Sequence, residues 1–108
     1  MFERSVWAEI DLTAIEHNVK EIKKKITNGA ALCAVVKADA YGHGALSVAQ
    51  AALKAGAERL AVAIVNEAVE LRDAGFKVPI LVLGYTPACQ AELVAQKDIT
   101  QTIFTLEA

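Results

Sequence analysis

The chain has 108 residues, of which 55% are hydrophobic and 6% aromatic, and its formal net charge is -2. A chain of this length can bury one compact core, which must here be built mainly from Ala, Val, Leu and Ile. The charge balance argues against nucleic-acid binding, and the one dense basic cluster, Lys20 with residues 23–25, fits a solvated helix face. No apolar run approaches the length that crosses a bilayer or marks a signal peptide. We therefore expect a cytoplasmic protein that binds neither nucleic acid nor membrane.

The first clear element is a helix. Residues 13–16 (TAIE) match a capping box, in which a Thr hydroxyl and a Glu carboxylate satisfy free amides at a helix start. Asn28-Gly29 predicts the end of this helix. Between them, apolar residues recur at helical spacing on one stripe: Ile15, Val19, Ile22 and Ile26.

The rest of the chain alternates strand and helix patterns. We expect strands at residues 31–37, 59–65, 79–83 and 99–105. We expect helices at residues 45–55, at 66–74 with Asn66 as cap, and from the Thr86-Pro87 start to about 96. This rhythm predicts an α/β fold with a parallel sheet, either an open doubly wound sheet or about half of an (α/β)8 barrel. Periodicity alone leaves both architectures open.

Two further features have less obvious roles. Residues 7–11 alternate apolar and polar positions, which predicts a strand, yet the chain offers this strand no evident partner. Cys33 and Cys89 fall within separate expected elements, so we expect neither a disulfide framework nor a metal site, and interpret both as reduced core residues.

The junction at residues 34–44 (AVVKADAYGHG) is the strongest candidate for chemistry. It joins the carboxyl end of an apolar strand to a helix start, which is where parallel α/β folds build active sites. Strand alternation puts Val35 and Lys37 on one face, where the lysine amine could attack an aldehyde. Gly42 and Gly44 could expose backbone amides to a phosphate, and Tyr41 could add a hydrogen bond.

Each of these residues also has an ordinary structural interpretation. A lysine at the end of a strand is commonly solvated, Tyr41 can simply pack, and the glycines can only shape a turn. His43 is better explained as a residue that caps a helix or supports the site than as a metal ligand. Leu83 ends the strand at 79–83, at the level of Lys37, and it is either an apolar wall beside a flat ring or ordinary core.

Residues 34–44 resemble the cofactor-attachment motif of alanine racemases, and the resemblance continues in order through almost the whole chain. It is supported by residues 7–12 (WAEIDL), 59–63 (RLAVA) and 79–84 (PILVLG). The resemblance implies a pyridoxal 5'-phosphate (PLP) enzyme that interconverts L-alanine and D-alanine, which supplies D-alanine for the bacterial cell wall. It also implies that the fold is about half of a PLP-binding (α/β)8 barrel.

The resemblance assigns roles to four residues. It implies that Lys37 binds the cofactor covalently and exchanges protons at the substrate Cα, that Tyr41 contacts the phosphate, and that Val35 and Leu83 line the ring. It also implies that residues 1–11 form a strand joining a β-rich domain absent from this sequence, while 12–108 form the first half of the barrel. The family is expected to be homodimeric, with a second catalytic base, a tyrosine, beyond residue 108.

Several alternatives remain at this stage. A racemase for another amino acid, a related decarboxylase or a small PLP carrier would share this barrel. The chain could instead be a non-catalytic half-barrel that associates through its open strand edges, or an open sheet without cofactor. We expect the chain alone to self-associate and to have negligible racemase activity.

Overall fold

Four short parallel strands form the centre of the protein. The computed structural model describes residues 7–107. The strands are β1 (Cys33–Val35), β2 (Arg59–Val62), β3 (Ile80–Val82) and β4 (Thr100–Gln101). They lie in the order β1-β2-β3-β4, and each pairs in parallel with the next. The predicted parallel α/β fold is confirmed.

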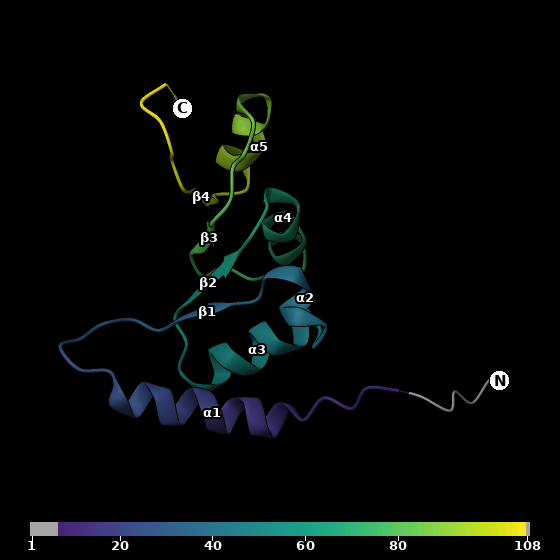
Figure 1. Cartoon of the computed structure of the whole chain (residues 1–108), viewed down its shortest axis with the longest axis vertical. Coiled ribbons are helices and arrows are strands. Elements are labelled where there is room, and N and C mark those ends of the chain that lie inside the picture. Colours follow the sequence, from purple (N-terminus) through teal and green to yellow (C-terminus); the bar gives the residue numbers. More distant parts are fainter. Residues whose placement is uncertain (1–6, 108) are drawn as a thin grey trace.

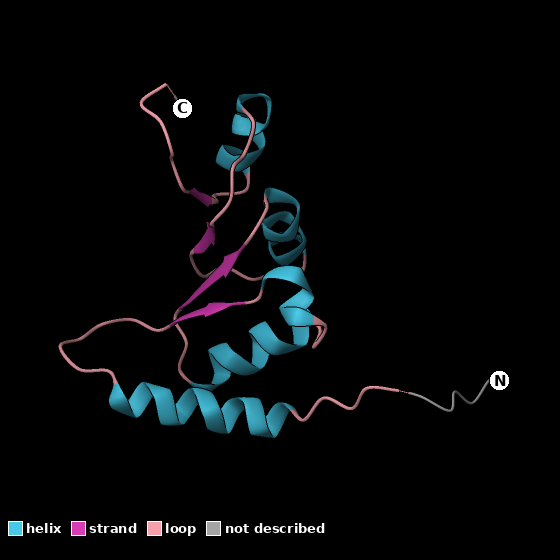
Figure 2. Cartoon of the chain, viewed as in Figure 1, coloured by secondary structure: helices cyan, strands magenta, loops and turns pink. Residues whose placement is uncertain are grey.

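The helices that connect the strands lie along the same side of the sheet (Figure 1). The right-handed helices are α1 (Leu12–Lys25), α3 (Ala45–Ala55), α4 (Val65–Asp73) and α5 (Ala91–Gln96), and a 3-10 turn, η1 (Ala88–Gln90), precedes α5. Figure 2 shows α3, α4 and α5 following one another beside successive strands, while α1 packs on α3. A doubly wound sheet would carry helices on both faces. One-sided cover with strands in sequence order is instead the winding of a barrel.

The core lies between the sheet and these helices. Strand side chains that face the helices are at most 1% exposed: Val36, Leu60, Val62, Ile80 and Val82. Ala49, Ala68 and Leu71 pack against them from α3 and α4. Each fully buried Val, Leu or Ile contributes on the order of 1.5–3 kcal/mol, so this layer holds the sheet to its helices.

The opposite face of the sheet is open. Val35 on β1 is 47% exposed and Leu83, just beyond β3, is 39% exposed. Their neighbours in sequence, Val36 and Val82, are buried on the helix side. The alternation predicted for the first strand is therefore confirmed, and the open face corresponds to the inside of a barrel.

Several predicted boundaries differ from the structure. Helix α1 begins two residues earlier than the capping-box pattern indicated, because Asp11, not Thr13, is the cap, and its carboxylate accepts the free amide of Ala14 at 3.1 Å. It ends at Lys25, before the predicted Asn28-Gly29 stop. Asn66 lies inside α4 rather than capping it, since the helix begins at residue 65.

The strands are shorter than predicted. The last one was expected at residues 99–105 and spans only Thr100–Gln101. Residues 7–11 have no strand pairing in the structure, and residues 1–6 lie outside the described residues. The assignment of residues 1–11 to a strand with a partner elsewhere therefore stays a prediction.

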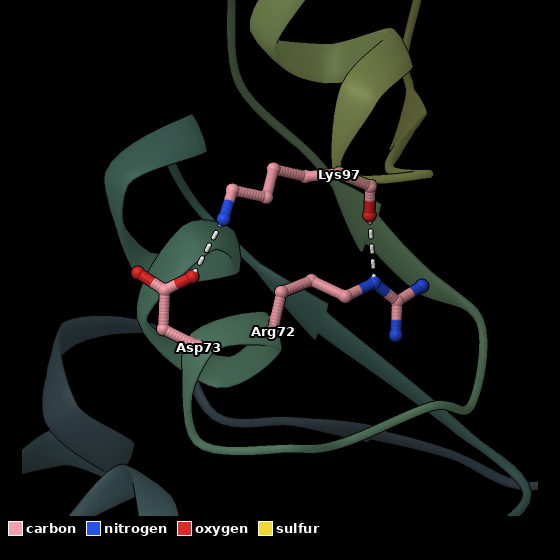
Figure 3. A network of polar contacts seen from close by, with 3 residues as sticks. All are labelled: Arg72, Asp73 and Lys97. Carbon is pink, nitrogen blue, oxygen red and sulfur yellow. Dashed lines mark hydrogen bonds and ion pairs between the residues drawn. The ribbon is translucent and has the colours of Figure 1, made fainter.

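The end of α4 is fastened to the last unit of the sheet. The Arg72 guanidinium donates to the carbonyl of Lys97, and Asp73 pairs with the Lys97 ammonium at 2.7 Å (Figure 3).

Within residues 7–107, no helix combines the length and apolar character needed to span a membrane.

Candidate active site

Three of the four predicted site residues lie on, or within two residues of the end of, strands β1 and β3, which both pair with β2. Val35 pairs with Ala61, which pairs with Leu81, and Lys37 and Leu83 each lie two residues further toward the carboxyl ends of their strands. Side chains two residues apart on a strand share a face. Val35 and Leu83 are both partly exposed, so the open face carries apolar surface at the end of the sheet where Lys37 begins the next segment of the chain.

The fourth predicted residue, Tyr41, lies next to the lysine. The Lys37 Nζ atom is 6.0 Å from the centre of the Tyr41 ring, at the outer limit of a cation-π contact. Tyr41 is 68% exposed. The structure thus brings an amine and a phenol together at the open end of the sheet.

An unusual backbone turn produces this arrangement. Four consecutive residues after Lys37 have positive φ angles of 52° to 55°: Ala38, Asp39, Ala40 and Tyr41. None is glycine, and left-handed helical geometry costs L-residues on the order of 1–2 kcal/mol each. The segment α2 (Lys37–Tyr41) is therefore a strained left-handed turn, although its hydrogen bonds are helix-like.

Side chains within the turn help to hold it. The Asp39 carboxylate accepts the amide of Ala45 at 2.7 Å and so caps the start of α3. The His43 Nδ1 atom donates to the carbonyl of Ala40 at 2.9 Å. His43 thus supports the turn, which agrees with its interpretation as a supporting residue.

The expectation that glycine frees amides for a phosphate is wrong for this turn. Gly42 and Gly44 do adopt positive φ angles of 87° and 91°. Their amides donate to the carbonyl of Asp39 at 3.1 and 2.9 Å, however, and the His43 amide donates to Ala40. The glycines therefore shape the turn, and the Asp39 carboxylate already occupies the amide at the helix start.

Sequence reasoning missed one residue that contacts this turn from outside it. Glu67, in the first turn of α4, accepts the amide of Ala38. Its position three residues after Ile64 is that of the Glu in a capping box, which was a usable signal for the local cap. Nothing in the sequence indicated the contact with residue 38.

The two cysteines are exposed, which contradicts their expected place in the core. Cys33 lies on the open face of β1, and partial burial raises the pKa of its thiol against the opposing effect of the Arg59 charge. Among residues 7–107, no group of three or more His, Cys, Asp or Glu side chains could hold a metal ion.

Comparison with known proteins identifies the family of this chain. Residues 10–108 match the family model described as "Alanine racemase, N-terminal domain". The chain belongs to the alanine racemase family. It is 52% identical over 106 residues to the alanine racemase of Desulfovibrio desulfuricans, and 53% identical over 106 residues to alanine racemase 1 of Bacillus subtilis.

The fold of this chain also occurs as one part of solved alanine racemases. The structure from Bacillus anthracis with bound L-Ala-P matches 99% of this chain with a TM-score of 0.93 and 48% sequence identity. That match confirms the predicted part of the (α/β)8 barrel. The matches to the Desulfovibrio desulfuricans and Bacillus subtilis relatives each include 98% of this chain. They include only 29% and 27%, respectively, of the length of those relatives.

Proposed function

We propose that Lys37 is the PLP-binding lysine of an alanine racemase and that Val35, Tyr41 and Leu83 complete the part of the cofactor site within this chain. The observation that carries this proposal is the position of Lys37 two residues after the carboxyl end of β1, with the centre of the Tyr41 ring 6.0 Å from its amine. Family membership supports the choice of cofactor.

The residues present fit such a cofactor. A primary amine is the group that forms a covalent bond with the aldehyde of PLP. Val35 and Leu83 offer exposed apolar surface at the same edge, which suits the face of a flat aromatic ring. The Tyr41 hydroxyl is the phosphate contact we propose, because the nearby glycine amides are already used.

The residues of this chain would have separate roles in the reaction. PLP, when bound, supplies the electron-withdrawing ring that acidifies the substrate Cα. Lys37 would hold the cofactor through its Nζ atom and, once released by the substrate amine, exchange a proton at one face of Cα. The apolar walls would orient the ring and exclude water. We propose that the second base, a tyrosine on the other face, lies outside this chain.

The activity can be tested in a hybrid enzyme. This chain would replace the matching segment of the Bacillus anthracis relative, and racemisation of L-alanine would be followed by chirality-specific assay. We expect K37A to abolish turnover and K54A, on exposed α3 surface, to retain it. Equal turnover by the two variants would refute the assignment. Parallel assays with other amino acids would test alanine preference against the related racemases.

The remaining expectations concern the assembly. We propose that the complete enzyme is a cytoplasmic homodimer. We also propose that the chain alone self-associates, because the face bearing Val35 and Leu83 and the edges of β1 and β4 are uncovered in the structure. Size-exclusion chromatography with light scattering would test this, and a compact stable monomer would count against it. We expect the chain alone to bind PLP weakly and to have negligible racemase turnover.

A further inference from the structure

The Glu67 carboxylate connects two neighbouring turns at the carboxyl edge of the sheet. Its Oε2 atom accepts the amide of Ala38 at 2.6 Å, across 29 positions of sequence. Its Oε1 atom accepts the amides of Ala63 at 2.9 Å and Ile64 at 3.2 Å. One side chain therefore joins the turn after β1 to the turn after β2.

Only one half of this arrangement is explained by helix capping. The bonds from Ala63 and Ile64 to Oε1 satisfy free amides at the start of α4, as a Glu at this position often does. The bond to Ala38 contributes nothing to α4, since Ala38 belongs to the left-handed turn. A second role is needed to account for it.

The Ala38 amide is a sensitive point of the turn. It belongs to the peptide unit directly after Lys37, so its direction is coupled to the backbone angle that aims the Lys37 side chain. Ala38 is also the first of the four consecutive residues with positive φ. The other side-chain hydrogen bonds of the turn come from Asp39 and His43, within it, whereas Glu67 reaches it from α4.

We infer that Glu67 is a positioning residue for Lys37: its Oε2 atom fixes the peptide after Lys37, keeps the strained turn in its left-handed form and so holds the amine over the open face. This inference rests on the proposed role of Lys37. Glu67 does not act as a base, because both of its oxygens are engaged by backbone amides.

The substitution Glu67→Gln separates the two roles. The Gln oxygen can still accept from Ala63 and Ile64, which preserves the cap of α4. The Gln amide group then faces the Ala38 amide, so that two donors oppose each other. Glu70→Gln is the matched control, because Glu70 lies on the same helix and is exposed. Glu67→Asp is a second variant, whose carboxylate is one methylene too short to span both turns.

Two readouts are measured on the chain with and without PLP. The first is amide hydrogen exchange at Ala38, compared with Ala63 and Ile64, in the absence of cofactor. The second is the ratio of pyridoxyl adduct at Lys37 to that at Lys20 after borohydride reduction, with both lysines in the same sample. A change confined to general stability would alter exchange at all three amides together and would leave the adduct ratio unchanged.

We expect Glu67→Gln to speed exchange at Ala38 by roughly tenfold or more, and to lower the adduct ratio by a similar factor, since a charged hydrogen bond is lost there. Exchange at Ala63 and Ile64 should change far less, and Glu70→Gln should match the unaltered chain. Unchanged exchange at Ala38 in both Glu67 variants would overturn the inference, as would faster exchange with an unchanged adduct ratio. If the unaltered chain shows no preference for Lys37, the proposed cofactor role fails, and the exchange comparison still decides whether Glu67 holds the turn.

Discussion

The Nε atom of Arg72 donates a hydrogen bond to the carbonyl oxygen of Lys97 at 2.8 Å, which joins the end of α4 to the turn before β4 (Figure 3). The remaining nitrogens of the same guanidinium donate to three more carbonyls, those of Phe76, Val78 and Asp98, at 2.8 to 2.9 Å. One planar group therefore fixes both the approach to β3 and the approach to β4.

We expect R72K to lower the free energy of unfolding by about 2–4 kcal/mol, because a lysine ammonium cannot reproduce a planar fork that serves four carbonyls. Urea denaturation followed by circular dichroism would measure the loss. D73N is the control, since it breaks only the exposed ion pair to Lys97 and should cost less than about 1 kcal/mol. Similar losses of unfolding free energy in R72K and D73N would contradict the role given to the Arg72 guanidinium.

Much of the fold was predictable because its local signals agree with its tertiary contacts. The helix at residues 45–55 was predicted with its observed bounds, since Gly44 and Gly56 flank an uninterrupted run of helix formers. The strand at residues 99–105 was predicted too long, because apolar and β-branched residues indicate the propensity for a strand but not where pairing ends. Here β4 has a single neighbour and pairs over two residues.

The site was predictable where it depends on strand alternation. Strand alternation predicts Val35 and Val36 on opposite faces, and the exposure of Val35 and burial of Val36 confirm this. The shared face of Val35 and Lys37 stays a prediction, because Lys37 begins the turn beyond the strand. The left-handed turn was not predictable, because Ala38 and Tyr41 carry no sequence signal for positive φ. Glu67 was missed as a contact of the turn because its partner lies 29 positions away.

The strain in the turn predicts an unusual response to glycine. We expect A38G to raise the free energy of unfolding by about 0.5–1 kcal/mol, because glycine adopts a positive φ without the cost that alanine bears. A14G, in the right-handed helix α1, should instead lower it by about 1 kcal/mol. Chemical denaturation of both variants would measure these changes, and destabilisation of equal size in the two would show that the turn is unstrained.

The cap that Asp39 provides to α3 predicts a difference between two substitutions. D39A should lower the free energy of unfolding by about 1 kcal/mol, because the amide of Ala45 loses its acceptor. D39N should cost much less, since an Asn oxygen can accept the same bond. Thermal denaturation followed by far-ultraviolet circular dichroism would compare them, and equal losses would indicate that charge, rather than capping, is what matters at this position.

The ion pair between Lys23 and Glu58 predicts a dependence of stability on pH. A hydrogen bond from Lys23, together with its charge, lowers the pKa of Glu58. A carboxyl group whose pKa is depressed by folding stabilises the protein above its ordinary pKa, and this contribution is lost as pH falls through the folded value. The stability difference between the unaltered chain and E58Q should therefore be largest near neutral pH and shrink in acid. In chains that also carry K23M, the stability difference caused by E58Q should not depend on pH in this way. If the same pH dependence persisted there, it would come from a group other than the pair of Lys23 and Glu58.

The claim that Lys37 is the cofactor lysine is tested most directly by trapping the adduct. The chain would be incubated with PLP and reduced with borohydride, and its eight lysines would be mapped by peptide mass spectrometry, with K37R as the control. We expect the pyridoxyl group predominantly on Lys37 in the unaltered chain, and no site of comparable yield in K37R. A label spread over Lys20 and residues 23–25, or no label above that of K37R, would contradict the account.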